Sequence, residues 1–572
     1  MLPRRRFLAV FAFLILAPAE LYAAEPARPK LAVMVVLDQF RADYLSRWDV
    51  LYGEDGFRRL EKEGAWFQNC HYPYALTVTA AGHASLATGC SPDVHGIVHN
   101  EWFDRTSGEV IESVENNRYE RVPAWPKDPP KDNDKETIKK KSRYGVSPQR
   151  LLAPTLADAL KEATAAKSKV VSLSLKDRAA VMPGGLKPDA CYWFDPDGGL
   201  FVTSTYYRDR VHDWVDTFNK EKPADRWFGK DWTKSNSDLD YERHSGPDDV
   251  DGEGKGYSQG RTFPHPLTGG LKQPGKAYYQ AVYTSPFGNE LLLELAERAI
   301  EAEKLGMRDA PDLLCLSFSA NDAIGHVWGP DSQEVLDVTL RTDVLLGNLL
   351  GFLDDKVGKG KYVMVVTADH GVCPLPEVTR SHGTDAGRID VSLLNQKASA
   401  FLDDKYGELE GKDRWFETGG VVRGYLNRSV IEKRGLREED VFDALAQWLE
   451  KQPGIQKAYT RFELAKKADK DDLLGASMRR SYFADRSADV LIVPKPYFVY
   501  FDKLVGTNHA TPHEYDTHVP LLVFGPGVNA GVYKEPITPL AVPVILAKLL
   551  GIKPPAKAEV EAPDKLFGPV TP

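Results

Sequence analysis

Residues 30–37 read KLAVMVVL, and Asp38 follows directly. This run is almost wholly apolar, rich in β-branched residues and free of the polar alternation that marks a half-exposed strand. It therefore predicts a strand buried on both faces, as in a parallel sheet. Three further runs have the same character: Lys169–Leu175, Asp312–Ser319 and Tyr362–Ala368. Four such strands predict one large buried sheet.

Helical segments fill the connections between these runs. Pro154–Ala166 precedes the second run, Asn289–Leu305 precedes the third, and Asp331–Asp354 precedes the fourth. Alternation of strands and helices is typical of βαβ units. The sequence therefore predicts an α/β fold, with a doubly wound, mostly parallel sheet and helices on both faces.

Polar or charged residues follow each run at the point where its strand should end. These residues are Asp38, Lys176-Asp177-Arg178, Asn321-Asp322 and Asp369-His370. The carboxyl ends of parallel strands lie at one edge of a sheet, and ligands of open α/β sheets bind there. Four such endings predict a single site assembled along that edge.

Length, charge and cysteine content limit the possible functions. The chain has 572 residues and a formal net charge of −9, which makes nucleic acid an unexpected partner. The five cysteines show no CxxC spacing, which argues against a zinc–thiolate site. Cys70 and Cys90 either pair in an oxidising compartment or stay as free buried thiols.

The first 24 residues show the three-part pattern of a secretory signal peptide. Arg4-Arg5-Arg6 precedes the apolar run Phe7–Ala17, and small residues continue to Ala24. Cleavage could follow Ala19, Ala23 or Ala24, and the arginines fit either the general or the twin-arginine export route. The apolar run is short for a membrane span, and an uncleaved anchor is the alternative. We expect a periplasmic or secreted protein that has no membrane anchor after cleavage.

The rest of the chain divides into a core and an inserted segment. Residues 25–382 and 501–572 are predicted to form the α/β core, and the last residues of the chain form a tail. Residues 383–500 mix short strands with helices and separate two pieces of the expected site. We expect this insertion to form a lid or crown.

Two regions of the core break the strand–helix alternation. Residues 122–143 are rich in Lys, Pro and Asp, and residues 227–265 are rich in Asp, Gly and Ser. Both compositions predict long surface loops or insertions. Asp249–Gly254 resembles the start of a calcium-binding loop, but Gly260 stands where an acidic ligand should close it. A solvated loop is therefore favoured over a calcium site.

Thr79 stands at the start of a predicted short helix. The extended segment Tyr72–Val78 leads into it, small residues follow, and Gly89 occupies the C-cap position. The unpaired N–H groups and the dipole of a helix N-terminus favour a bound anion. Two interpretations stay open at this point. Thr79 is either the N-cap of the helix or a reactive group that faces an anion.

Candidate metal ligands stand at or near the predicted strand ends. They are three carboxylates and three imidazoles: Asp38, Asp322, Asp369, His326, His370 and His509. Asp322 and His326 are four residues apart, so both can reach one ion from a helical turn. Nitrogen and oxygen ligands without thiolates suit two zinc ions, each with an open position. Paired metals about 4 Å apart are a common device for phosphoryl transfer.

These motifs together resemble the alkaline phosphatase superfamily. Within it, they are similar to the secreted, single-chain phosphate monoesterases that have a threonine nucleophile and two zinc ions. The nucleotide pyrophosphatase/phosphodiesterases are the next most similar group. The resemblance runs from Leu31 to about Leu550, and its most specific segments are Leu37-Asp38-Gln39, Thr79 with Gly82-His83-Ala84-Ser85, Gly96–Asn100, Ser174–Arg178, Asp322 with His326, Thr367–Gly371 and Asp516–Pro520.

The resemblance implies a role for each candidate residue. One zinc ion would be held by Asp322, His326 and His509, and the other by Asp38, Asp369 and His370 together with the Thr79 oxygen. Coordination by a metal is one of the few ways to activate a threonine hydroxyl at neutral pH. Thr79 would attack phosphorus and form a phosphothreonine, which water would then hydrolyse.

Asn100, Lys176 and Arg178 would contact the non-bridging phosphoryl oxygens. In an extended segment the i, i+2 spacing puts Lys176 and Arg178 on one side. Arginine supplies a planar fork and lysine a point charge. A monoester presents three free oxygens, whereas a diester carries a second organic group where these cations would lie. The set therefore favours monoesters. The alternative is that both cations are exposed strand-end charges.

Three nearby histidines compete for the last zinc position. His509 is preferred over His513 and His518, although it lies in a Thr-Asn-His-Ala-Thr-Pro run where the family usually has Thr-His-Gly-Ser-Pro. Ala510 thus replaces a glycine. His83 is expected to support the helix of the nucleophile without binding metal.

The predicted activity is zinc-dependent hydrolysis of small-molecule phosphate monoesters to orthophosphate, by a monomeric enzyme. A phosphodiesterase or nucleotide pyrophosphatase on the same scaffold is the alternative. A sulfatase would need a Cys-x-Pro-x-Arg motif, and in Cys90–Val94 a valine stands in place of the arginine. A non-catalytic secreted binding protein is disfavoured because neither Thr79 nor any metal ligand is missing.

Overall fold

A central sheet of eleven strands organises the structure, a computed structural model that describes residues 28–124, 144–466, 471–501 and 504–568. The strands, in their order across the sheet, are β19 (Gly531–Tyr533), β2 (Ala65–Phe67), β18 (Leu521–Phe524), β13 (Tyr362–Thr367), β1 (Leu31–Leu37), β12 (Asp312–Phe318), β7 (Val170–Ser174), β8 (Ala190–Asp195), β9 (Leu200–Ser204), β5 (Glu115–Val122) and β6 (Tyr144–Val146). From β13 to β8 all neighbours are parallel, whereas β18 and β9 pair antiparallel with the ends of this group. The predicted mostly parallel sheet is confirmed, and its four predicted strands lie side by side as β13, β1, β12 and β7.

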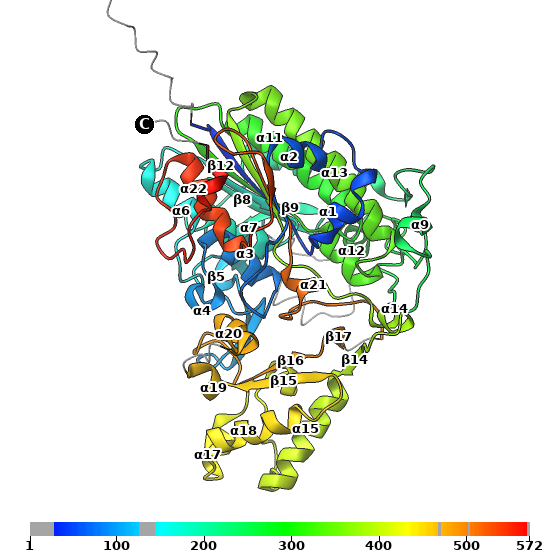
Figure 1. Ribbon diagram of the computed structural model, residues 1–572, viewed down its shortest axis with the longest axis vertical. Coiled ribbons are helices and arrows are strands. Elements are labelled where there is room, and N and C mark those ends of the chain that lie inside the picture. Colours follow the sequence, from blue (N-terminus) through cyan, green and yellow to red (C-terminus); the bar gives the residue numbers. More distant parts are fainter. Residues whose placement is uncertain (1–27, 125–143, 467–470, 502–503, 569–572) are drawn as a thin grey trace, which may run out of the picture.

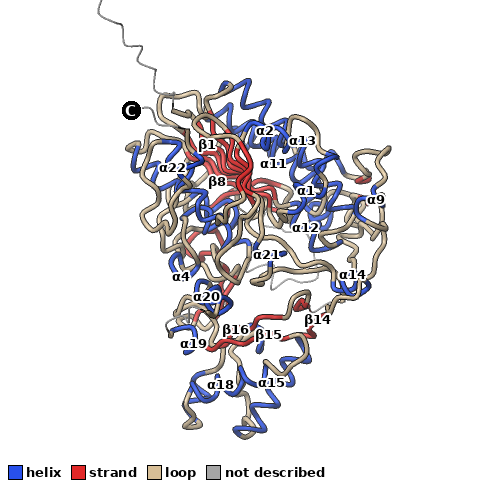
Figure 2. The backbone as a smooth tube through the Cα atoms, viewed as in Figure 1, coloured by secondary structure: helices blue, strands red, loops and turns tan. Residues whose placement is uncertain are grey.

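Burial explains why these strands lack alternation in sequence. All residues of β1 and β12 are buried, and the helices cover both faces of the sheet. A strand with two covered faces places apolar side chains on both. The sheet therefore lies in the middle of the core, with helices on each side (Figure 2).

Helices form one layer on each face of the sheet (Figure 1). The first layer consists of α3 (Thr79–Thr88), α6 (Leu156–Ala163), α7 (Asp177–Gly184) and α22 (Val542–Leu550). The second consists of α2 (Phe57–Glu63), α11 (Pro286–Glu303) and α13 (Gln333–Leu353), with α12 (Ala320–Trp328) packed against α11 and α13. Shorter elements include α1 (Asp43–Arg47), α4 (Pro92–His95), β3 (Glu101–Asp104), β4 (Glu109–Glu112), α8 (Asp213–Glu221), α10 (Lys276–Tyr283) and α21 (Glu514–Thr517). The doubly wound arrangement is confirmed.

The chain from β14 (Gly387–Asp390) to β17 (Phe498–Phe501) forms a body at the bottom of Figure 1, which we call the cap. In it β14 pairs with β17, and β15 (Ile455–Thr460) pairs with β16 (Val490–Pro494). Its helices are α14 (Pro376–Ser381), which leads into it, α15 (Val391–Tyr406), α16 (Gly420–Arg423), α17 (Arg428–Lys433), α18 (Glu438–Leu449), α19 (Arg461–Ala465) and α20 (Leu473–Arg480). The cap has an apolar cluster of its own, which includes Phe442 and Leu445. Action as a lid stays a prediction.

Several predictions made from the sequence concern the chain ends and the cysteines. The predicted signal peptide, residues 1–24, lies outside the described residues, and the predicted loop 122–143 lies almost wholly outside them. In the part of the chain that the structure describes, no helix is both long and apolar enough to cross a membrane. All five cysteines are buried and free, so Cys70 and Cys90 are not joined by a disulfide.

The segment 227–265 differs from the predicted surface loop because it is anchored in the core. Trp232 and Tyr241 are buried, and both side chains donate hydrogen bonds of 2.7 Å to the carboxylate of Asp337 on α13. The same carboxylate accepts the Ser235 N–H at 2.6 Å. The apolar anchors of a mostly polar segment could not be recognised without the partner carboxylate on α13. Within the same segment, Asp249 pairs with Arg261 at 2.5 Å.

The buried carboxyl group of Glu253, in this segment, should make the stability of the protein depend on pH. Its side chain is buried, and burial together with the charge of Glu334 raises its pKa from 4.5 to about 9. The unfolded chain loses this proton at the lower pKa and the folded chain at the higher one, so the free energy of unfolding falls as pH rises from 4.5 to about 9.

We therefore expect Glu253→Gln to raise the unfolding temperature at about pH 8, and the gain to shrink as pH falls towards 4.5, the ordinary pKa of the group. Thermal unfolding followed across this pH range measures the effect. Glu242→Gln, at an exposed position of the same segment, is the control and should show no such dependence. A gain that does not change with pH would contradict the assignment.

Candidate functional site

The ends of four neighbouring strands bring the predicted site residues together. Asp38 follows β1, Lys176 follows β7 after one residue, and Asp369-His370 follows β13 after one residue. Asp322 lies in the first turn of α12, which begins just after β12. Because β13, β1, β12 and β7 are adjacent and parallel, all four endings meet at one edge. The structure thus brings these predicted residues together at this edge.

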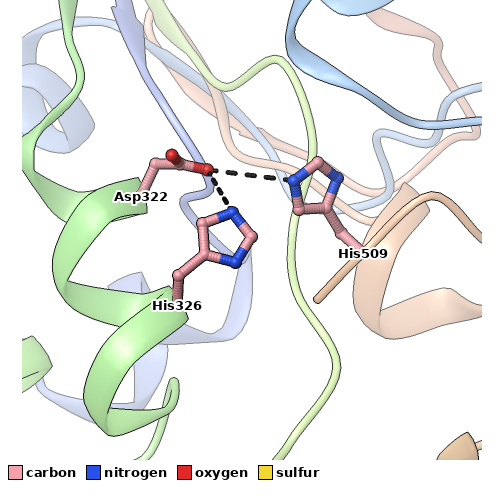
Figure 3. Close-up of side chains that lie close together, drawn as sticks. All are labelled: Asp322, His326 and His509. Carbon is pink, nitrogen blue, oxygen red and sulfur yellow. Dashed lines mark ion pairs between the residues drawn. The ribbon is translucent and has the colours of Figure 1, made fainter. Parts of the chain in front are cut away.

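Asp322, His326 and His509 form one group of possible metal ligands (Figure 3). Their spacing on α12 lets Asp322 and His326 face the same way, with Oδ1 and Nε2 3.2 Å apart. His509 approaches from the loop before α21, and its Nε2 lies 3.9 Å from the same oxygen. One carboxylate and two imidazoles thus converge from two segments that are far apart in the sequence.

A second group lies beside the first and shares Asp322 with it. Asp38, Asp322 and His370 each offer one ligand atom within 4.8 Å of the others. The Nε2 of His370 is 3.6 Å from Asp38 Oδ1 and 3.4 Å from Asp369 Oδ2. The two groups together contain all six predicted ligands except Asp369, which borders the second group through His370.

The three imidazoles are held in the tautomer that metal ligation requires. The Nδ1 of each lies within hydrogen-bond distance of a backbone carbonyl: His326 with Thr507 at 2.8 Å, His370 with Gly371 at 2.9 Å and His509 with Thr77 at 2.7 Å. A carbonyl only accepts, so Nδ1 carries the proton and Nε2 offers its lone pair to the cluster. Metal-binding histidines are commonly fixed in this way. Burial also lowers the pKa of His370 and of His509.

The carboxylates are buried without enough donors. Asp38 and Asp369 have no exposed surface, and among the described residues both oxygens of Asp38 and one of Asp369 lack a well-directed hydrogen bond. Burial and the charge of Asp369 raise the pKa of Asp38 well above its usual value. Several buried carboxylates need cations close by. This donor set of carboxylates and neutral imidazoles suits divalent metal ions such as zinc.

Lys176 supplies one positive charge to this cluster. Its Nζ lies 2.7 Å from Asp38 Oδ2 and 2.6 Å from Asp322 Oδ2. Burial raises the pKa of Asp322, but the charges of Lys176 and His326 outweigh it and bring that pKa well below the usual value. Lys176 is thus a buried partner of the cluster, and the alternative of an exposed strand-end charge is wrong for it.

Thr79 is buried beside the same cluster. It is the first residue of α3, and Val78 is the N-cap residue, so the interpretation of Thr79 as the N-cap is wrong. Its Oγ1 lies 3.4 Å from His370 Nε2 and 3.4 Å from Lys176 Nζ. Asn100 takes the capping role, because its Oδ1 accepts the Ala80 N–H at 2.9 Å. The Thr79 hydroxyl is therefore left facing the ligands.

Neighbouring residues hold α3 and the carboxylates in place. His83 lies with Nδ1 2.9 Å from the Thr79 carbonyl and 3.2 Å from Asp369 Oδ2, and its Nε2 is 2.8 Å from Ser317 Oγ. This position agrees with the expected supporting role. Gln39 was quoted in a motif but given no role by the sequence; its Nε2 donates to Asp322 Oδ1 at 3.0 Å and its N–H to Asp369 Oδ1 at 3.2 Å.

Arg178 lies differently from the prediction. Lys176 is the N-cap residue of α7 and is extended, but Asp177 and Arg178 already belong to the helix. The two cations therefore do not share one side of an extended segment. Arg178 and Tyr283 line a cavity of about 410 Å³ next to Lys176, and Arg178 Nη1 faces Asp177 at 3.7 Å.

The two competing histidines lie outside the cluster. His513 Nε2 lies 2.9 Å from the Pro494 carbonyl, and His518 Nε2 lies 2.9 Å from that of Gln68. Neither belongs to a group of possible ligands in the described part of the chain. Ala510 adopts a φ of +82°, which explains why a glycine suits this position elsewhere.

The amount of zinc bound by each variant tests whether His509, His513 or His518 is a metal ligand. We expect His509→Ala to lower the amount of zinc bound per chain by about one ion, because a group of three ligands loses one of its imidazoles. His513→Ala and His518→Ala should retain the full amount. Elemental analysis of zinc-loaded, desalted protein measures this, and a full zinc content in His509→Ala would contradict the assignment.

Gly82 tests the contact between α3 and the end of β13. A Cβ at this position would lie 2.3 Å from the Asp369 carbonyl oxygen and 2.7 Å from its Cβ. Gly82→Ala should lower the free energy of unfolding by about 1–3 kcal/mol through overpacking. Gly351→Ala on α13, where an added Cβ would meet no atom of another described element within 4 Å, should raise it by about 0.5–1 kcal/mol. Denaturant unfolding compares the two, and equal effects would show that the contact imposes no constraint.

Comparison with known proteins agrees with this geometry. The family of type I phosphodiesterases / nucleotide pyrophosphatases matches residues 32–518. The alkaline phosphatase PafA of Elizabethkingia meningoseptica is 32% identical over 532 residues, which are 93% of each chain. The alkaline phosphatase PhoV of Synechococcus elongatus is 34% identical over 88% of this chain and 87% of its own. A crystal structure of PafA matches with a TM-score of 0.86 over 95% of this chain and 99% of that chain. The chain therefore belongs to the type I phosphodiesterase / nucleotide pyrophosphatase family, in the group that contains the alkaline phosphatases PafA and PhoV.

Proposed function

We propose that this protein is an alkaline phosphatase that hydrolyses phosphate monoesters to orthophosphate. One observation carries the proposal: the Thr79 hydroxyl lies at a helix N-terminus, 3.4 Å from both an imidazole of the ligand cluster and the Lys176 ammonium. A nucleophile, ligands for a metal and a cation for phosphate thus adjoin one another. The relatives named as alkaline phosphatases support the same activity.

We assign two zinc ions to the cluster. Asp322, His326 and His509 would hold one ion, and Asp38, Asp369, His370 and Thr79 would hold the other. Bound zinc supplies Lewis-acid stabilisation of the attacking and leaving oxygens in such a site. The two neighbouring ligand groups, which share Asp322, support a site for two adjacent ions.

In the first step Thr79 Oγ attacks phosphorus. A bond forms between Oγ and phosphorus as the bond from phosphorus to the ester oxygen breaks. The hydroxyl proton of Thr79 passes to water, and the departing alkoxide takes a proton from water. Asn100 is oriented for this step because its Oδ1 faces the Ala80 N–H, so the amide hydrogens point the other way. They can donate to a phosphoryl oxygen, as can the N-terminus of α3.

In the second step water attacks the phosphothreonine. The bond between phosphorus and Thr79 Oγ breaks, orthophosphate leaves and the hydroxyl is regained. Lys176 and Arg178 stabilise the charge on the non-bridging oxygens in both steps. The four-carbon stem of Lys176 lets Nζ turn from the carboxylates to a phosphoryl oxygen beside Thr79.

Asn100, Lys176 and Arg178 together argue for monoesters over diesters as substrates. A diester would place an uncharged organic group against Lys176, which is buried, and Arg178, which is partly buried, and would leave both cations poorly compensated. A phosphodiesterase activity is the alternative on this scaffold. We also propose that residues 1–24 direct export to the periplasm or out of the cell and that the mature enzyme is monomeric.

Turnover of two substrates tests the proposal. Zinc-loaded protein should cleave p-nitrophenyl phosphate faster than bis-p-nitrophenyl phosphate. Lys176→Ala/Arg178→Ala should lower kcat/KM for the monoester by about 100–1000-fold or more and affect the diester much less.

Lys220→Ala/Arg210→Ala is the matched control, since both side chains are more than two-thirds exposed, at 75% and 83%. It should leave both activities unchanged. Preference for the diester, or an equal loss on both substrates in the first variant, would favour the phosphodiesterase alternative.

A further inference from the structure

A second cationic cavity lies between the core and the cap, away from the ligand cluster. Its volume is about 520 Å³, and five arginines line it: Arg105 and Arg150 from the core, and Arg428, Arg461 and Arg486 from the cap. Asp104 and Asp485 are the carboxylates in its lining. Five positive charges thus face two negative ones, although the catalytic proposal uses none of these residues.

One buried carboxylate beneath the cavity serves three of the arginines. Asp489 is fully buried and pairs with Arg105, with Arg428 at 2.5 Å and with Arg461 at 3.6 Å. Arg428 also faces Glu438 at 3.9 Å. A single Asp489 charge cannot neutralise three guanidinium groups. Positive charge therefore remains on the side that faces the cavity.

Carbonyl oxygens, and no carboxylates, hold the other two arginines. Arg486 donates to the carbonyls of Gly96 at 2.5 Å and Arg150 at 2.7 Å, and Arg150 donates to that of Glu115. In the described part of the chain neither has a carboxylate within ion-pairing distance. Burial and the charge of Arg150 lower the pKa of Arg486 to about 10, which reflects this crowding of positive charge.

We propose that this arginine cavity binds a phosphate group, at a site distinct from the catalytic centre. Guanidinium forks match the oxygens of a tetrahedral oxyanion and can bind it from several directions. The volume lies in the range of small-molecule sites, so it admits orthophosphate or the phosphates of a short polyphosphate chain. The inference rests on this geometry and does not depend on the proposed catalytic activity.

Such a ligand would join the cap to the segment that carries Asn100. Arg486 of the cap already bonds to Gly96, four residues before Asn100, and Asp104 at the end of β3 lines the cavity. Arg428 and Arg461 reach the same cavity from the cap side. A bound phosphate therefore bridges both bodies and adds to the stability of their contact.

The test counts phosphate ions by isothermal titration of the zinc-loaded full chain with inorganic phosphate. Wild type should bind two ions per chain, one in each site. Arg150→Gln/Arg461→Gln should lose one of them, or weaken it at least tenfold, and keep the monoesterase activity measured in phosphate-free buffer. Lys176→Ala/Arg178→Ala should lose the phosphate bound at the catalytic site and retain the phosphate bound in the arginine cavity.

Arg437→Gln and Arg210→Gln are matched controls, because these arginines are 72% and 83% exposed and lie outside the cavity. Both should bind as wild type does. If the double variant fails to fold, Arg461→Gln alone replaces it, since its pairing with Asp489 is the longest of the three.

Titration of Thr79→Ala protein with tripolyphosphate distinguishes the source of the phosphate group. Tighter binding than orthophosphate at the arginine cavity indicates a polyphosphate, and weaker binding indicates free phosphate. Binding of a single phosphate by wild type, or two undiminished events in the cavity variants, overturns the proposal. A lack of monoesterase activity with the cavity event intact would contradict only the catalytic proposal.

Discussion

The structure depends on the burial of three carboxylates, Asp38, Asp322 and Asp369, at one edge of a parallel sheet. Carboxylates without water must have positive charge or hydrogen-bond donors around them. The surroundings meet this need with the Lys176 ammonium, which lies within 2.7 Å of two of them, and with imidazoles that turn Nε2 inward. The same arrangement leaves the Thr79 hydroxyl facing the cluster, so the constraint that organises the edge also supports its chemistry.

Much of this edge could be predicted from the sequence, because functional residues follow each buried strand within a few residues. The location of Asp38, Asp322 and Asp369 at one edge could be predicted from the apolar runs and from the rule that neighbouring parallel strands end at the same edge of a sheet. His509 was harder to predict as a ligand, since it lies far along the chain from these strands. Only the three-dimensional structure distinguishes it from the nearby His513 and His518. The Thr77 carbonyl accepts a hydrogen bond from His509 Nδ1, so Nε2 of this histidine faces the cluster.

Contacts between distant segments account for what the sequence did not predict. Asn100, twenty residues after Ala80, accepts the Ala80 N–H at the start of α3, and no local sequence pattern indicates this contact. The predicted extended Lys-x-Arg segment turns into α7 at Asp177. Trp232 and Tyr241 look like loop residues until Asp337 on α13 provides their partner. These contacts join segments that are far apart in the sequence. The sequence of either segment alone therefore does not indicate them.

The central claim is that Thr79 attacks phosphorus and becomes phosphorylated. The stereochemistry of phosphoryl transfer tests it most directly. A phosphate monoester made chiral at phosphorus with three oxygen isotopes is incubated with zinc-loaded enzyme and an alcohol acceptor, and the configuration of the new ester is determined. Two successive displacements, first on Thr79 and then on the acceptor, predict retention of configuration. Inversion would mean one direct displacement and would contradict a phosphothreonine intermediate.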